Sequence, residues 1–336
     1  MKGQYSNIEI KGIVSAVPKN KVCNLDYIEK IESRRIKKQV MLTGIENRRV
    51  CIDGQKASDL ATIAADKLLN LLEWNRSEID VLIFVTQSPE LSRPSTAFII
   101  QQRLGIGKDC LVYDINLGCS GYIGGIETIA AILSATKGRG LLLVGESNAL
   151  ASGDLSTSSL LEGDAASATA LEYGNQTSML FRHYSDGSRA NYIYKPFDKP
   201  GVMDGNAVLL FGLNEVVDSV KQFHADHHLS VSDVDYYIFH QAQKMIVEGV
   251  AQSAELPSEK VLLSSNDYGN TSSASIPLTA CLHLNHEKET GKKKIFMCGF
   301  GIGLSWGIVY CEIDTMNILP LVSSDYVFDD RDMFQM

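Results

Sequence analysis

The stretch INLGCSGYIGG, from Ile115 to Gly125, joins an apolar run to a helical pattern through one cysteine set among small residues. The preceding LVYDIN (Leu111 to Asn116) has the length and composition of a buried strand. The following GYIGGIETIAAILSA is apolar on almost every side, which predicts a helix that is buried on several sides. Its glycines lower helix propensity, and the close approach of a neighbouring helix or sheet would compensate for that cost. We therefore expect Cys119 at a strand-to-helix junction inside a layered α/β protein.

Further apolar runs of the same length alternate with longer helical patterns along the chain. They are DVLIFVT (Asp80 to Thr86), GLLLVGE (Gly140 to Glu146), DYYIFH (Asp235 to His240) and KIFMCGF (Lys294 to Phe300). Continuous apolar strands separated by helices indicate a mainly parallel sheet that is covered on both faces.

Two of these strands lie in similar surroundings, which suggests an internal repeat. SEIDVLIFVTQ begins at Ser77, and SDVDYYIFHQA begins at Ser232. The segments around Cys119 and DYGNTSSAS (Asp267 to Ser275) also correspond, because each precedes a helix rich in small residues. One short match can arise by chance, but the repeated order of elements favours a duplicated fold.

Composition and charge exclude several classes of protein. The chain has 336 residues, of which 45% are hydrophobic, so it can bury a core without disulfides or a metal. The net charge of -9 argues against a nucleic-acid binder. Its seven cysteines are scattered without the CxxC spacing of a zinc or redox site, which fits a reducing compartment. The N-terminal sequence lacks the apolar core of a signal peptide, and no apolar run approaches the roughly 20 residues of a membrane helix. We expect a cytoplasmic protein that does not span a membrane.

Cys119 is the strongest candidate for a reactive group. At the start of a helix its sulfur would lie near unpaired amides and the positive end of the helix dipole, and both favour the thiolate. The alternative is a small buried hydrophobic residue, which is the usual role of a free cysteine.

Two polar residues further along the chain are weaker candidates. His240 ends the strand DYYIFH, and strand ends are where ligand sites form in α/β sheets. Asn270 in DYGNTSS also fits an ordinary turn before a helix that is capped by Thr271 or Ser272. The segment GFGIGLSWG (Gly299 to Gly307) does not have the spacing of a phosphate loop, so a closely packed strand or turn is the better interpretation.

The order cysteine, histidine, asparagine also occurs in papain-like thiol proteases. The local signature of that family around its cysteine is absent here, because Leu117 and Gly118 precede Cys119. A protease therefore stays a remote alternative.

The motifs taken together resemble the β-ketoacyl-acyl-carrier-protein synthase III family of the thiolase-like superfamily. They are GCSGY at Cys119, HQAQ at His240, YGNTSSAS at Asn270, SDGS at Ser185 to Ser188, and GFGIGLSWG. The resemblance implies a five-layer αβαβα fold built from two duplicated halves, and normally a homodimer. On this basis we expect an N-terminal half over 1–172, a C-terminal half over 173–313, and an extension over 314–336.

The resemblance also implies the roles of the site residues. Cys119 would take an acyl group from a thioester, and His240 and Asn270 would act in the second half-reaction. There a malonyl thioester loses carbon dioxide, and two neutral N–H donors stabilise the enolate oxygen. The backbone amides of Cys119 and Ile302 would bind the oxyanion that forms when the enolate attacks. No cofactor or metal is expected, because the substrates carry phosphopantetheine or coenzyme A themselves.

The sequence departs from the family at several positions. Lys38 and Leu42 replace a tryptophan and an arginine that commonly hold the coenzyme A nucleotide, and Ser156 replaces a further arginine. Arg93 stands where an aromatic residue often crosses the dimer to line the partner's acyl pocket. Arg93 thus suggests a polar or carboxylate-bearing acyl chain, or it is an ordinary solvated arginine.

The basic cluster before Lys38 suggests how the primer arrives. An acyl carrier protein presents its pantetheine arm from an acidic surface, and a basic landing site would attract it. The candidate residues are Arg34, Arg35, Lys37 and Lys38. The alternative is a solvated charged face of a surface helix.

The function that the sequence favours is a decarboxylating condensation that makes a β-ketoacyl thioester on an acyl carrier protein, in fatty-acid or related biosynthesis. An acyltransferase of the same fold, which passes the acyl group from Cys119 to a hydroxyl or an amine, is the alternative.

Overall fold

The computed structural model describes residues 1–27, 33–149, 160–197, 199 and 201–334. Within these residues, nine strands form one continuous sheet, and two strand pairs, β2–β3 and β8–β9, lie apart from it. In sheet order the eight strands of the main path are β10 (Tyr236–Phe239), β11 (Lys292–Gly301), β12 (Ser305–Asp314), β1 (Lys2–Pro18), β7 (Ala165–Ser185), β6 (Arg139–Glu146), β4 (Val81–Val85) and β5 (Leu111–Ile115). The ninth strand, β13 (Val322–Ser324), pairs with the end of β1, and the short strands are β2 (Lys21–Cys23), β3 (Asn47–Arg49), β8 (Ile193–Tyr194) and β9 (Val202–Met203).

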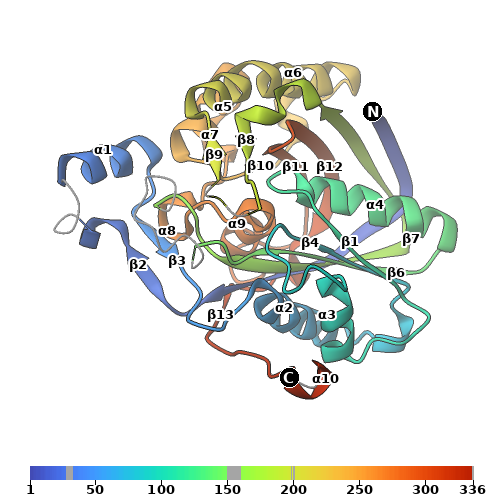
Figure 1. The fold of residues 1–336 in the computed structure, drawn as a ribbon. Helices are drawn as coiled ribbons and strands as arrows, with labels where there is room; N and C mark the ends of the chain where they lie inside the picture. Colours follow the sequence, from blue (N-terminus) through green and yellow to red (C-terminus); the bar gives the residue numbers. More distant parts are fainter. Residues whose placement is uncertain (28–32, 150–159, 198, 200, 335–336) are drawn as a thin grey trace.

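The helices lie in three groups relative to this sheet. The longer ones are α1 (Ser33–Thr43), α2 (Ala57–Leu71), α3 (Thr96–Leu104), α4 (Gly121–Thr136), α6 (Val217–Asp226), α7 (Lys244–Ser253) and α9 (Ser275–His283). The shorter ones are α5 (Gly205–Phe211), α8 (Ser265–Tyr268) and α10 (Arg331–Phe334). Helices α5 to α7 lie on one side of the molecule, α2 and α3 on the other, and α4 and α9 lie between them (Figure 1).

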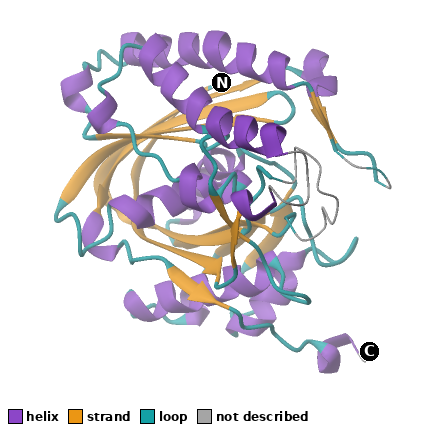
Figure 2. Ribbon diagram, turned by 90° about the vertical axis from the view of Figure 1, so that its left-hand side faces the viewer, coloured by secondary structure: helices purple, strands orange, loops and turns teal. Residues whose placement is uncertain are grey.

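The predicted five-layer α/β fold is confirmed. Figure 2 shows outer helices, strands, central helices, strands and outer helices in succession. The buried side chains form three clusters that follow these layers: one around α4 and α9, one beneath α2 and α3, and one beneath α6 and α7. The strand β1 contributes side chains to two of these clusters, because Ile13 faces the central helices and Val14 faces α2.

The sheet is mixed, which differs from the mainly parallel sheet that we expected. The strands predicted from apolar runs do pair in parallel, as β4 with β5, β4 with β6, and β10 with β11. The two long strands β1 and β7 pair antiparallel, and β7 also pairs antiparallel with β6 and β12. Because β1 and β7 run through both halves of the sheet, the boundary expected at residue 172 falls inside β7.

The repeat seen in the sequence corresponds to the same local structure in both places. A 3-10 turn, η2 (Arg76–Glu78), precedes β4, and a second turn, η5 (Val231–Asp233), precedes β10. Each of the two strands then pairs in parallel with a neighbour, β4 with β5 and β10 with β11.

The glycines of α4 allow the close packing that the sequence predicted. A Cβ atom at Gly121 would lie 2.5 Å from Val85 Cγ1, and one at Gly125 would lie 2.5 Å from Leu142 Cδ1. The helix therefore lies closer to β4 and β6 than side chains would permit. No helix among the described residues is long and apolar enough to cross a bilayer.

Candidate active site

Cys119 lies in the turn between β5 and α4, next to the helix N-cap Ser120. The end of β11 packs directly on this turn. A Cβ atom at Gly301 would lie 2.7 Å from Cys119 Cβ and 3.1 Å from its Sγ, and one at Gly299 would lie 3.0 Å from the Cys119 carbonyl oxygen. The interpretation of GFGIGLSWG as a closely packed strand and turn is confirmed, since β11 ends at Gly301 and β12 begins at Ser305.

The segment from Asn270 to Ser275 connects the predicted site residues. The backbone N–H of Ser272 donates to Asn270 Oδ1 over 2.9 Å. The Ser272 hydroxyl lies 3.8 Å from Cys119 Sγ. The Ser275 hydroxyl lies 2.9 Å from His240 Nδ1. Cys119 and His240, which are far apart in the sequence, thus both contact the short segment that Asn270 begins.

His240 is held at the end of β10 by contacts on several sides. Its side chain is buried, its backbone N–H donates to the Cys298 carbonyl over 2.8 Å, and the Phe300 ring packs edge-on against the imidazole. The next residue, Gln241, donates from its backbone N–H to the Ser275 hydroxyl over 3.3 Å. The Gln241 side chain in turn accepts a hydrogen bond of 2.8 Å from the Ser264 N–H. Such a constrained imidazole has little freedom to rotate.

Burial sets the charge state of both reactive side chains. It lowers the pKa of His240 to about 4, an effect that a hydrogen bond to the Ser272 backbone opposes only in part. Burial raises the pKa of the Cys119 thiol to about 11, and the carboxylates of Glu146 and Glu162 raise it further. The Ser272 hydroxyl and the helix-start backbone act in the opposite direction but do not compensate. The backbone at the helix start lowers the thiol pKa, as we expected, but burial outweighs it, so the net shift is upward and disfavours the thiolate in the resting site.

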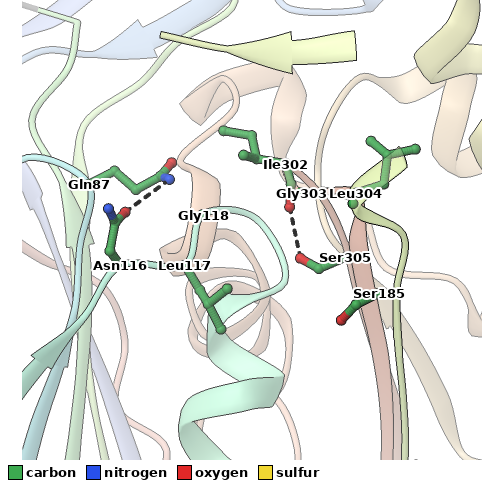
Figure 3. A pocket seen from close by; sticks show the side chains of 10 residues that line it. Gln87, Asn116, Leu117, Gly118, Ser185, Ile302, Gly303, Leu304 and Ser305 are labelled. Atoms are coloured by element: carbon green, nitrogen blue, oxygen red, sulfur yellow. Dashed lines mark hydrogen bonds between the residues drawn. The ribbon is translucent and has the colours of Figure 1, made fainter. Parts of the chain in front are cut away.

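A cavity of about 280 Å³ adjoins the Cys119 turn (Figure 3). Gln87 and Asn116 lie on one side of it, joined by a hydrogen bond of 3.2 Å, and the loop from Ile302 to Ser305 lies opposite. The predicted oxyanion residue Ile302 lies close to the nucleophile turn, since a Cβ atom at Gly118 would be 3.4 Å from Ile302 Cδ1.

Comparison with known proteins agrees with this arrangement. Family models of 3-oxoacyl-(acyl-carrier-protein) synthase III match residues 113–187, and those of its C-terminal part match residues 225–313. The chain is 32% identical over 307 residues to β-ketoacyl-(acyl-carrier-protein) synthase III of Bacillus pumilus, which covers 90% of this chain and 98% of that protein. It is 30% identical to the enzyme of the same name from Neisseria meningitidis serogroup A, over 92% of this chain and 99% of that protein.

The solved structure of a 3-oxoacyl-(acyl-carrier-protein) synthase from Burkholderia xenovorans superimposes with a TM-score of 0.91 at 32% identity, covering 96% of this chain and 99% of that one. The chain belongs to the β-ketoacyl-acyl-carrier-protein synthase III family. By that membership it is a transferase of the acyltransferase type.

The positions where the chain departs from this synthase III family lie mostly at the surface. Arg93 is exposed within a single chain, so its reach into a partner's pocket stays a prediction. Arg34, Lys37 and Lys38 are exposed on α1, as is Leu42. Ser156 and the side chain of Arg35 lie outside the described residues.

Sequence reasoning did not identify three residues that shape this synthase III site. Ser272 lies in the 3-10 turn before α9, Ser275 is the first residue of α9, and Glu162 lies beside Asn270. Glu162 forms an isolated parallel bridge with Asn270, so the two side chains leave the backbone on the same side. The available signal was the serine-rich SSAS that follows Asn270, but nothing local shows that these hydroxyls face a cysteine and a histidine.

Proposed function

We propose that this chain condenses an acyl primer, held on Cys119, with a malonyl thioester and releases carbon dioxide and a β-ketoacyl thioester. The observation that supports the proposal is a pair of hydrogen bonds from the segment 270–275. One involves the side chain of Asn270 and the other the side chain of His240, the two residues proposed to donate to the substrate. The Ser272 N–H occupies Asn270 Oδ1, and the Ser275 hydroxyl occupies His240 Nδ1. The Asn270 NH₂ then has no hydrogen-bond partner among the described residues, and the imidazole, which also interacts with the Ser272 backbone, would give up or share that contact to donate from Nε2 to the substrate.

In the first half-reaction Cys119 Sγ attacks the carbonyl carbon of the primer thioester. The carbon–sulfur bond to the donor breaks, and the departing thiolate takes up the proton that the Cys119 thiol loses. We propose that the backbone amides of Cys119 and Ile302 stabilise the oxyanion of the tetrahedral intermediate. The exchange of one thioester for another needs no cofactor or metal.

In the second half-reaction the malonyl thioester loses its carboxylate as carbon dioxide and becomes an enolate. The Asn270 NH₂ and the His240 Nε2–H would donate to the enolate oxygen. Because the lowered pKa keeps the His240 imidazole neutral, it can act as a donor without binding the anion permanently. The Ser275 hydroxyl can accept from the Gln241 N–H and donate to Nδ1, which would keep the imidazole proton on Nε2.

Condensation then returns the nucleophile to its starting state. The enolate carbon attacks the acyl carbon on Cys119, and the carbon–sulfur bond breaks as the β-ketoacyl thioester forms. The Cys119 thiolate that is released recovers its proton from solvent.

Related proteins and the surface of the chain support an acyl carrier protein as a partner. The names of the relatives specify acyl-carrier-protein substrates. The exposed Arg34, Lys37 and Lys38 on α1 offer a positive patch on a chain with a net charge of -9. We also propose a homodimer, since among the described residues β5 pairs with β4 alone and leaves its other edge open at the border of the sheet.

The decisive experiment combines acyl thioesters, malonyl thioester and mass spectrometry. Wild-type protein should gain the mass of one acyl group on Cys119 and should then release carbon dioxide from malonyl thioester. Cys119→Ala should take up no acyl group. Acyl transfer to an added alcohol or amine without release of carbon dioxide would instead support the alternative acyltransferase, and label on another cysteine would refute the assignment of the nucleophile.

A further inference from the structure

The chain continues beyond the last strand of the fold and returns along α2 and α3. After β12 it passes through a 3-10 turn, η8 (Thr315–Asn317), pairs as β13 with the end of β1, and ends near α10 (Figure 1). The Gln55 side chain holds this segment by donating to the carbonyls of Ser324 and Tyr326, over 3.2 and 3.3 Å. The backbone N–H of Phe328 donates to Asp59 Oδ1 over 3.2 Å. The C-terminal segment is thus attached along its length rather than only at one point.

The end of this segment contacts a buried arginine, Arg103. The Arg103 side chain on α3 is only 3% exposed and contacts the carboxylates of Asp59, Glu90 and Asp330. Asp330 receives two hydrogen bonds from the guanidinium, one of them 3.1 Å long. The Phe328 ring covers the guanidinium, with its centroid 4.9 Å from the Arg103 Cζ. The C-terminal segment therefore supplies both a bidentate carboxylate and an aromatic cover to Arg103.

Arg103 also contacts the loop 87–95, which follows β4. Arg103 donates to Glu90 Oε1 over 3.0 Å, and Lys56 donates to Glu90 Oε2 over 2.6 Å. Glu90 lies in the middle of the loop 87–95, and its backbone N–H donates to Thr96 Oγ1 over 3.0 Å. The start of the loop is fixed separately, because the Gln87 N–H donates to Glu146 over 2.9 Å.

This loop reaches the cavity beside the nucleophile with its first residue. Gln87 lines that cavity, and a Cβ atom at Gly118 would lie 2.6 Å from Gln87 Oε1. The exposed Arg93 stands three residues after Glu90 on the same loop. A displacement of Glu90 would change the course of the loop between these two residues.

We propose that Phe328 and Asp330 are positioning residues for the primer pocket: they hold Arg103 against Glu90 and so fix the loop 87–95 that reaches the cavity next to Cys119. The inference rests on the proposed function, because it takes that cavity as the place of the acyl chain. Without Asp330, Arg103 keeps Asp59 and Glu90 as partners, and Lys56 and Ser58 still contact Glu90, so the fold persists. The bidentate contact that fixes the guanidinium is lost, and the position of the Arg103–Glu90 pair in the loop becomes less well fixed. The C-terminal extension then acts on the choice of primer rather than on the chemistry.

The test compares Asp330→Asn with Asp329→Asn. Asp329 is the matched control, since its carboxylate is exposed and pairs with Arg331 next to it. Each variant is incubated with an equimolar mixture of acetyl, butyryl, hexanoyl and octanoyl thioesters, and the acyl groups on Cys119 are counted by intact mass. We expect Asp330→Asn to change the ratio of long to short acyl groups roughly three- to tenfold, the range seen for positioning networks. Asp329→Asn should keep the wild-type ratio.

Hydrogen exchange provides the second readout. Asp330→Asn should speed amide exchange in residues 87–95 and leave residues 233–240 unchanged. If Asp330→Asn does not fold, Phe328→Leu replaces it, because it keeps the ion pair and the apolar volume and removes only the aromatic cover. Wild-type ratios and wild-type exchange in the folded variant would overturn the inference. Failure of wild-type protein to become acylated would instead refute the proposed function.

Discussion

The resting charge of Cys119 can be tested by the pH dependence of its alkylation. Burial, followed by the nearby carboxylates, raises the thiol pKa to about 11. At pH 7 a thiol with that pKa is about one part in ten thousand thiolate, and the thiolate is the reactive form. The rate of modification by iodoacetamide should therefore rise about tenfold for each pH unit between 7 and 9. Peptide mapping by mass spectrometry assigns the label, and Cys119→Ala supplies the background from the other cysteines.

Glu162→Gln extends this prediction with a change of known sign. The Glu162 carboxylate disfavours the thiolate, so its removal should lower the pKa of Cys119 and raise the alkylation rate at pH 7. The slope with pH should stay the same, because the thiol remains mostly protonated. A rate that is constant between pH 6 and 8 would refute the reasoning. Such a plateau would mean that a thiolate and an imidazolium form a stable pair at rest, as in thiol proteases.

The remaining predictions concern the two half-reactions and the substrate. His240→Ala and Asn270→Ala should leave acylation of Cys119 intact and slow condensation by about two to three orders of magnitude each. Condensation is measured as carbon dioxide release from the acylated enzyme. Equal loss of acylation and condensation in His240→Ala would instead make His240 a base for the thiol. Gly301→Ala should slow acylation at least about tenfold and lower the melting temperature, because its Cβ would lie 2.7 Å from Cys119 Cβ and 3.1 Å from the sulfur and would displace the nucleophile turn. Acyl-carrier-protein primers should outcompete coenzyme A thioesters, and this preference should shrink with salt and in Arg34→Glu and Lys38→Glu variants; rapid, salt-insensitive acylation from coenzyme A would contradict it.

The parts of the fold that the sequence predicts are those with a local signal. The apolar runs predicted the parallel strands β4, β5, β6, β10 and β11, and β4, β6 and β10 are buried almost throughout, so they need no polar alternation. The prediction that Leu111–Asn116 forms a buried strand was only partly right, because β5 lies at the border of the sheet and Leu111 is 51% exposed. The antiparallel pairing of β1 with β7 had no such signal, since it joins Lys2–Pro18 to Ala165–Ser185 across half the chain. The register of β1 against β7 depends on which face of each strand the central helices cover and which face the outer helices cover. This is known only once the layers have assembled.

The site follows the same division between local and assembled features. The candidates Cys119, His240 and Asn270 follow from motifs in the sequence, and Cys119 and His240 contact the segment 270–275, which begins with Asn270. The partners Ser272 and Ser275 could not be ranked above other hydroxyl residues, because only the folded chain brings them to a cysteine and an imidazole.

The pKa of the Cys119 thiol shows which contributions a local sequence pattern leaves out. A helix start is a local feature, and its effect on the thiol has the predicted sign, since the backbone at Cys119 lowers the pKa. The opposing effects come from elsewhere: burial by neighbouring layers, and the carboxylates of Glu146 at the end of β6 and Glu162 beside Asn270. A protonated resting thiol suits transfer between thioesters, because attack and departure each exchange one thiol for another and no net charge has to be created in the buried site. The neutral His240 is consistent with this, since an imidazolium there would stabilise the thiolate in the resting enzyme. That ground-state stabilisation would reduce the difference in binding between the ground state and the transition state, and so the rate enhancement.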